Sequence, residues 1–181
     1  MRAANLLLLV PFLLTGCDFL GSINTHQFPD QERGVVDGVK LGQRSLNELK
    51  QYGVVIADSR EGTVIILPAD KLFRESIDRV TLNPDYQVVL NQLVYVLKGY
   101  PKVNLSIVGH TDGVMTDDLD EQLSSKYAYA VTNYLTAAGI SPLRITSVRG
   151  AGSTQPIIRR NNVDARAVNR RVEITTSTSI K

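Results

Sequence analysis

The chain has 181 residues, enough for one domain with a proper core plus an appendage. Its apolar fraction of 43% and charged fraction of 21% are ordinary for a globular protein. The formal net charge of +2 at pH 7 excludes a strong global field, so any partner has to be argued from local groups of side chains.

Residues 1–17 have the layout of an export signal. Arg2 gives a short cationic start, and the apolar run 6–14 is too short to span a bilayer as a mature helix. Small residues then precede Cys17, the only cysteine in the chain. This pattern is typical of a bacterial lipoprotein signal peptide over residues 1–16, cleaved before Cys17, whose sulfur then carries lipid with palmitate-type acyl chains. A plain secretory peptide before a disulfide cysteine is the alternative, and the lack of a second cysteine disfavours it.

Residues 17–39 are mixed in character and weakly periodic, as expected of a lipidated tether. About twenty extended residues at roughly 3.3–3.6 Å each reach on the order of 65 Å, so the domain can leave the lipid surface. We therefore expect an outer-membrane lipoprotein that faces the periplasm. Asp18 leaves the inner membrane open, because lipoprotein sorting in enteric bacteria uses an aspartate there as a retention signal.

Residues 40–62 are expected to form an accessory helix and the first strand of a hairpin. Leucines at helical spacing lead to Tyr52, and Gly53 ends the helix. The apolar runs 54–57 and 63–67 flank a polar loop that contains Gly62, which predicts a β-hairpin.

Two amphipathic helices are expected in the middle of the chain. Asn83-Pro84-Asp85 supplies a capping side chain, a proline for the first turn and an acid at the positive end of the helix dipole. This helix is expected to end near Gly99, and a second one covers residues 119–138. Their apolar stripes are Tyr86, Val89, Leu90, Leu93, Val94 and Leu97 in the first helix, and Leu123, Tyr127, Val131, Tyr134, Leu135 and Ala138 in the second.

Strands are expected at residues 103–108, 145–148 and 171–176, with a short helix at 163–169 before the last strand. Strands that alternate with helices predict a two-layer α/β sandwich, a single sheet with its helices packed on one face.

The strand at 103–108 runs into "GHTDG", where His110 and Asp112 face the same side at i, i+2. Such a pair could be metal ligands or a catalytic acid and base. His26 is the only other histidine, however, and no nearby glutamate or cysteine completes a zinc set. We therefore expect no catalytic residue, no metal, no cofactor and no enzyme activity.

Two groups of opposite charge stand out. One contains Asp112, Asp117, Asp118, Asp120 and Glu121, and the other contains Arg144, Arg149, Arg159, Arg160, Arg166, Arg170 and Arg171. These groups could be solvated faces, could pair with each other, or could jointly hold a zwitterion. A nucleic acid is a disfavoured partner, because an exported protein is separated from the usual nucleic acids of the cell. In addition, no aromatic side chains alternate with the arginines to stack on bases.

The chain contains, in this order, the segments "VGHTDG", "LSSKYAYAV", "YLTAAGI", "RITSVRGAG" and "ARAVNRRVEI". Together they resemble the OmpA-like C-terminal domain, the family of outer-membrane protein A, the peptidoglycan-associated lipoprotein and the flagellar stator protein MotB. The resemblance covers residues 63–176 and leaves 177–181 as a tail. It implies an α+β domain of the βαβαβ type, a two-layer sandwich of one mixed sheet with helices on one face, that binds peptidoglycan without covalent bonds.

The resemblance also implies a ligand, the diaminopimelate of the stem peptide, which carries an ammonium and a carboxylate at its far end. Asp112 matches the family's aspartate and is expected to accept from the ammonium, while His110 and Thr111 shape the loop.

Tyr127 stands where the family has its ligand-binding arginine, and it stays a candidate ligand contact. A phenol donates only one hydrogen bond, however, and cannot bind a carboxylate in the bidentate way that a guanidinium does. Lys126 lies about 100° away around the helix and is no simple substitute. Met115 and Asp120 also depart from the common glycine and asparagine. Either Tyr127 has joined the apolar face and binding is weak or lost, or Arg166 or Arg170 takes the carboxylate.

Two functional hypotheses follow. The first is a lipid-anchored periplasmic protein whose partners are peptidoglycan and, through Cys17, a membrane, so that it tethers a membrane or an envelope complex to the cell wall. The second is a structural lipoprotein subunit of a secretion-system core, of type IV or type VI kind, with weak or lost peptidoglycan binding. The adjacent Arg159 and Arg160 favour envelope protein partners.

Overall fold

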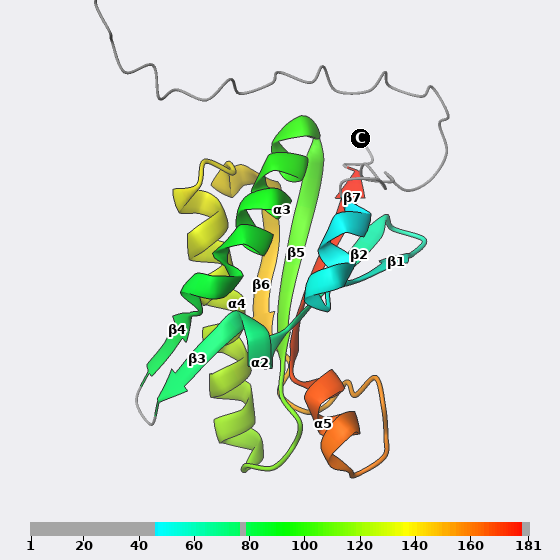
Figure 1. The fold of residues 1–181 in the computed structure, drawn as a ribbon, viewed down its shortest axis with the longest axis vertical. Coiled ribbons are helices and arrows are strands. Elements are labelled where there is room, and N and C mark those ends of the chain that lie inside the picture. Colours follow the sequence, from blue (N-terminus) through cyan, green and yellow to red (C-terminus); the bar gives the residue numbers. More distant parts are fainter. Residues whose placement is uncertain (1–45, 77–78, 179–181) are drawn as a thin grey trace, which may run out of the picture. The chain divides into compact units, whose positions relative to one another are not determined.

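The computed structural model describes residues 46–76 and 79–178 (Figure 1). All of them belong to one compact unit, Gly34–Lys181. The predicted signal peptide, the tether with Cys17 and Asp18, and the first residues of the accessory helix lie outside the described residues.

A five-stranded mixed sheet forms one layer of this unit. Only β5 and β6 are parallel, and the other neighbouring strands are antiparallel. This confirms the predicted mixed sheet and the predicted hairpin at its edge. The strand order is β1-β2-β7-β5-β6, with β1 Val55–Asp58, β2 Thr63–Pro68, β7 Arg171–Thr178, β5 Val103–His110 and β6 Ile145–Gly150.

Two helices form the second layer, α3 (Gln87–Gly99) and α4 (Asp117–Ala137). As predicted, the Asn83 side chain caps the start by accepting from the Asp85 backbone N–H, and a 3-10 turn, Pro84–Tyr86, leads into α3. The apolar stripe of α3 is buried as expected. It packs with α4 and with inward-facing strand residues such as Ile65, Ile107 and Ile174 in a single core.

Two glycines let α4 approach the sheet closely. A Cβ on Gly109 of β5 would lie 1.9 Å from the Ser124 carbonyl oxygen, and one on Gly150 of β6 would lie 2.4 Å from the Ser124 hydroxyl oxygen. Any larger residue would push α4 away from the strand ends. The N-terminal half of α4 is therefore held directly over the carboxyl ends of β5 and β6, and this fixes the loop that begins at Thr111.

The structure contains elements that the sequence did not predict. After β2 come a short helix, α2 (Ala69–Leu72), and a separate two-stranded sheet made of β3 (Phe73–Ser76) and β4 (Arg79–Leu82). The expectation of a single sheet is therefore corrected. The expected accessory helix is, in its described part, mainly a 3-10 helix, Glu48–Tyr52, and it ends as predicted at Gly53, with φ 85°.

Helix α5 (Val163–Asn169) matches its predicted range and lies beyond one end of the sheet (Figure 1). The Asn162 side chain caps it by accepting from the Ala165 backbone N–H. The chain then passes through Arg170 into β7. This end of the sheet gathers the end of β5, the loop after β6 and α5.

Candidate functional site

A cavity of about 470 Å³ lies at this end of the sheet. Its wall is formed by the loop after β5, the connection from β6 to α5, and α5 itself. The residues that line it are Asp112, Gly113, Val114, Ser153, Pro156, Ile158, Arg159, Arg160, Asn161, Arg166 and Asn169. Two of the predicted site residues, Asp112 and Arg166, therefore share one cavity although 54 positions separate them in the sequence.

Arg170 joins Asp112 to a third element. One guanidinium nitrogen, Nη1, donates to Asp112 Oδ2. Nε and Nη2 donate to the two carboxylate oxygens of Asp70 in α2, each at 2.7 Å. The hydrogen bond to Asp70 raises the pKa of Arg170 above its usual value against the opposing effect of burial, and the bond to Asp112 adds to it. Arg170 is thus a permanent cation fixed between two carboxylates.

Asp112 is nearly enclosed but not completely so, with 10% of its side chain exposed. Its Oδ2 is occupied by Arg170. Within residues 46–76 and 79–178, no hydrogen bond to its Oδ1 is found. The predicted aspartate therefore has one oxygen held by the protein and one available at the cavity wall.

Asn169, the residue before Arg170, holds the loop that leads to α5. Its Oδ1 accepts from the backbone N–H groups of Ile157 and Ile158 at 2.9 and 3.1 Å, and its Nδ2 donates to the Ile158 carbonyl at 2.9 Å. The Asn169 side chain thus satisfies three backbone groups with a single amide and places the residues that follow Ile158 at the cavity rim.

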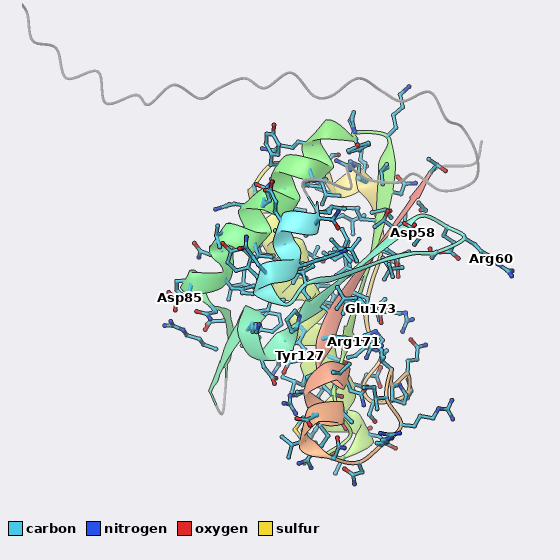
Figure 2. All side chains as sticks on the ribbon, turned by 45° about the vertical axis from the view of Figure 1, so that its right-hand side comes forward. Asp58, Arg60, Asp85, Tyr127, Arg171 and Glu173 are labelled. Atoms are coloured by element: carbon cyan, nitrogen blue, oxygen red, sulfur yellow. The ribbon has the colours of Figure 1, made fainter. Side chains whose placement is uncertain are left out.

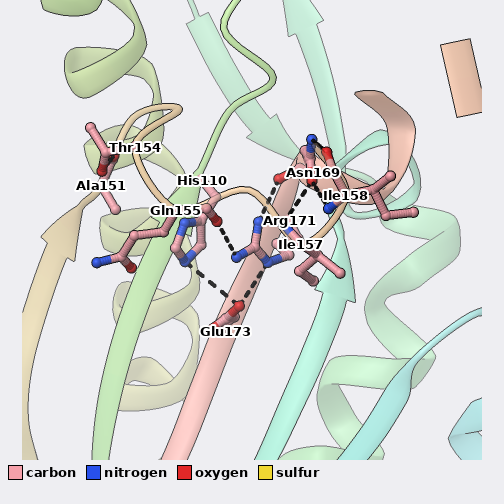
Figure 3. Close-up of polar contacts among 9 residues, drawn as sticks. All are labelled: His110, Ala151, Thr154, Gln155, Ile157, Ile158, Asn169, Arg171 and Glu173. Carbon is pink, nitrogen blue, oxygen red and sulfur yellow. Dashed lines mark hydrogen bonds and ion pairs between the residues drawn. The ribbon is translucent and has the colours of Figure 1, made fainter. Parts of the chain in front are cut away.

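Arg171 is buried on the sheet face opposite α4 (Figure 3). It donates to Glu173 Oε1 at 2.7 Å, to the Asn169 carbonyl at 3.0 Å and to the Gln155 carbonyl at 2.9 Å. These bonds link the loop after β6 to β7. These three consecutive residues therefore hold different parts of the site. Asn169 and Arg171 bond to the loop before α5, and Arg170 bonds to Asp112.

His110 lies opposite Arg171 in the neighbouring strand and is only 1% exposed. Its Nε2 is 3.8 Å from Glu173 Oε1, and neither ring nitrogen has a hydrogen-bond partner in the described part of the chain. Burial, reinforced by Arg171 and Arg149 and opposed by Glu173, lowers the pKa of His110 to about 4. The ring is therefore neutral at physiological pH. It packs beside Arg171 and does not line the cavity.

Thr111 and Asp120 lie beside Gly152 rather than on the cavity surface. The Thr111 backbone N–H donates to the Gly152 carbonyl at 2.9 Å, and a Cβ on Gly152 would be 3.6 Å from the Asp120 Cβ. Both side chains are buried, and the Thr111 hydroxyl and both Asp120 carboxylate oxygens have no hydrogen-bond partner among the described residues.

Tyr127 does not line the cavity. Tyr127 lies in the interior of the molecule (Figure 2) and is fully buried. Its ring stacks on Phe73 of β3 with a centroid distance of 4.6 Å and an interplanar angle of 8°. Of the two interpretations of this position, the structure places Tyr127 in the apolar face of α4. Lys126 is exposed and lines a different hollow, on the outer side of α4.

The predicted basic group divides into structural and cavity-lining arginines. Arg144 donates to the carbonyls of Leu97, Tyr100 and Val103 and so ties the end of α3 to the start of β5, and Arg171 is buried as described. Arg159, Arg160 and Arg166 line the cavity instead. Asp70 is the partner that sequence reasoning missed, because nothing in "LPADKL" marks it as lying near Arg170, one hundred residues later.

No group of three or more histidine, cysteine, aspartate or glutamate side chains in residues 46–76 and 79–178 is placed to hold a metal ion. Over the same ranges, no helix has the length and apolar character needed to cross a membrane.

Residues 76–170 match the model of the OmpA family, which is just over half of the chain. The chain belongs to the OmpA family. It is 32% identical over 131 residues to the probable lipoprotein YiaD of Escherichia coli K12, a match that covers 72% of this chain and 58% of YiaD. It is 36% identical over 97 residues to the peptidoglycan-binding protein ArfA of Mycobacterium tuberculosis H37Rv, covering 54% of this chain and 29% of ArfA. In both cases, less than two thirds of the relative is spanned.

The fold of this OmpA family member also matches a solved structure, the cell wall anchor of the T6SS from Pseudomonas aeruginosa. The TM-score is 0.65 and the sequence identity is 25%, and the match covers 75% of this chain and 95% of that one. The predicted family and the predicted α+β fold are thus both confirmed.

The buried His110 predicts a specific pH dependence of stability. Its pKa is about 4 in the folded state and about 6.5 when exposed, so between these values the unfolded chain binds a proton that the folded chain does not. The free energy of unfolding should therefore fall by about 3 kcal/mol from this group as the pH drops from 6.5 to 4.

Urea denaturation of the wild type and of His110→Gln at pH 7 and pH 4.5 measures this contribution, because the carboxylate contributions cancel in the difference. We expect the variant to lose less stability on acidification than the wild type. Equal losses would show that His110 is not the titrating group.

Proposed function

We propose that this chain is a lipid-anchored envelope protein whose OmpA family domain binds peptidoglycan non-covalently and tethers a membrane to the cell wall. One observation carries the proposal: the only carboxylate on the cavity wall, that of Asp112, faces a space bordered by three guanidinium groups. Opposite charges that line one cavity suit a ligand end that carries both an ammonium and a carboxylate.

The ligand that fits this chemistry is the side-chain end of diaminopimelate in a stem peptide. Its ammonium would donate to Asp112 Oδ1, the oxygen that Arg170 does not use. Arg170 need not move, because Asp70 holds it from the other side. Arg166, from α5, is the candidate partner for the ligand carboxylate.

In this proposal the loss of the family arginine at position 127 does not abolish binding. The side chain at that position packs against Phe73 and contributes to the core instead. The guanidinium groups come from the opposite wall, formed by the loop before α5 and by α5 itself. His110 and Thr111 shape the loop from behind and make no direct contact with the ligand.

The proposed location is the outer membrane, with the domain in the periplasm and the lipid on Cys17; the inner membrane is the alternative, given Asp18. The similarity to a protein named a probable lipoprotein supports the anchor, and the names of the other two relatives support cell-wall binding. We further propose that the domain binds its ligand without catalysis and without a metal or other cofactor.

A second candidate function is a structural subunit of an envelope-spanning secretion machine. The structural similarity to the cell wall anchor of the T6SS favours it. So does the buried Tyr127, because loss of the family arginine weakens a purely ligand-binding role. The two functions are compatible in one protein.

Replacing Asp112 tests the proposed binding. Asp112→Asn keeps the side chain's shape but removes the charge that attracts an ammonium. A charge-assisted hydrogen bond contributes about 1.5–3 kcal/mol, so we expect roughly 10- to 100-fold weaker co-sedimentation with purified peptidoglycan sacculi.

The matched control is Asp117→Asn, which removes the same charge from the neighbouring exposed residue that begins α4. It should pellet with sacculi like the wild type. If Asp112→Asn also pellets like the wild type, Asp112 is not the anchor and the proposal is wrong.

The lipid anchor is tested at Cys17. Cells that express the wild type should incorporate labelled palmitate into the protein, and cells that express Cys17→Ser should not, because the variant has no sulfur to receive the lipid. Labelling of both proteins would contradict the assignment of Cys17.

The second candidate function is tested by isolation of the native protein after gentle detergent extraction. A subunit of a machine should be recovered with other envelope proteins at constant ratios across independent preparations. Recovery as a lone monomer that still binds sacculi would contradict the role as a subunit of a machine and would support only the tethering function.

A further inference from the structure

The cavity carries more positive charge than one zwitterionic ligand end requires. Its wall contains one carboxylate, Asp112, and three guanidinium groups, those of Arg159, Arg160 and Arg166. Asp112 is already paired with Arg170, which does not itself line the cavity. A ligand with a single carboxylate would leave most of this positive charge unmatched.

These three arginines also have no side-chain partner among the described residues. Across residues 46–76 and 79–178, none of them forms an ion pair or a side-chain hydrogen bond with another residue. Arg144, Arg170 and Arg171, by contrast, are all used structurally. Among the described residues, three guanidinium groups thus line one cavity without an ion-pair partner of their own.

The backbone that presents them is fixed. Arg159 and Arg160 follow Ile158, whose N–H and carbonyl are both bonded to the Asn169 side chain. Arg166 lies on α5, whose first turn is capped by Asn162. The side chains of Arg159 and Arg160 are exposed, but the loop that carries them is attached at the cavity rim rather than loose in solvent.

We propose that Arg159 and Arg160 form a second anion subsite of this cavity, which binds the free C-terminal carboxylate of the stem peptide whose diamino acid contacts Asp112. The inference rests on the proposed function, because it assigns a further part of the same ligand. Guanidinium suits this role, since its planar donors match a carboxylate in a bidentate arrangement. A volume of about 470 Å³ is within the usual range for sites that hold a small molecule.

This arrangement selects for stem peptides that are not cross-linked. A cross-link to the side-chain amine converts the ammonium into an amide and removes the partner of Asp112. A cross-link through the peptide's C-terminus converts that carboxylate into an amide and removes the partner of Arg159 and Arg160. Only a peptide with both groups free satisfies both subsites.

Two synthetic tetrapeptide ligands test the subsite. They share the same diaminopimelate side chain, and one ends in a free carboxylate while the other ends in a carboxamide. Calorimetry with the soluble domain (residues 40–181) should show that the wild type binds the free acid at least tenfold more tightly. The double variant Arg159→Gln/Arg160→Gln should bind both peptides with the affinity that the wild type has for the amide.

The matched control, Lys126→Gln/Arg149→Gln, removes two positive charges from residues outside this cavity wall. It should keep the preference for the free acid. Because all four positions are exposed, circular dichroism should show that both double variants are folded.

The outcomes separate the two proposals. Equal binding of both peptides by the wild type overturns the subsite but leaves peptidoglycan binding intact, whereas binding of neither peptide overturns the proposed function itself. If the Arg159→Gln/Arg160→Gln variant keeps the peptide preference but loses binding to phosphatidylglycerol vesicles, the two arginines face an anionic membrane and the subsite assignment is wrong.

Discussion

The contact on which this end of the molecule depends is the Arg170 guanidinium held between Asp70 and Asp112. It connects α2, the loop after β5 and the junction between α5 and β7, three segments with no sequence proximity to one another. A guanidinium group suits this position because its donors lie in one plane and can serve two carboxylates at once. The two carboxylates stabilise its charge, although about a quarter of its side chain, 27%, remains exposed. Such a fixed cation also keeps one oxygen of Asp112 permanently engaged, which leaves a single, defined oxygen for anything that enters the cavity.

The wall around this contact is held by close backbone packing against α4 on one side and by side-chain polar bonds on the other. On the helix side, Gly109 and Gly150 admit Ser124 of α4, so the strand ends and the helix approach more closely than a Cβ would permit. On the opposite sheet face, Arg171 bonds to Glu173 and to the loop carbonyl of Gln155, beside a neutral His110 (Figure 3). A buried imidazole without a hydrogen-bond partner is costly to protonate, so acid pH should destabilise the fold through this face of the sheet. The same side chains therefore hold the cavity wall and stabilise this end of the sheet.

Sequence patterns predicted most of this fold because its main elements carry strong local signals. The capped helix after Asn83 and the long helix α4 begin and end within about three residues of their expected positions, and the short helix before Arg170 matches its expected range. The hairpin of β3 and β4 was missed, because its strands have four residues each and no turn signal stronger than their surroundings. For the site, "GHTD" and "NRR" pointed to Asp112 and Arg170 as candidates, and pairing between the two charged groups was one of three alternatives. No pattern could show which residues pair, nor that Asp70 is a second partner of Arg170. Contacts across one hundred residues depend on how the sheet is ordered, and strand order is not encoded in local spacing.

Tyr127 shows how a side chain near the strand ends can serve the core rather than the cavity. A guanidinium there would have to be desolvated against Phe73 or turned towards the cavity, whereas the tyrosine ring stacks on Phe73 and fills the core. The guanidinium groups that line the cavity therefore come from α5 and the loop before it. The loop before α5 is held by three hydrogen bonds from the Asn169 side chain and by the bond from Arg171 to the Gln155 carbonyl. Much of the positive charge of the cavity therefore lies on an exposed loop, where side chains can change without repacking the core, so ligand preference can change while the fold stays the same.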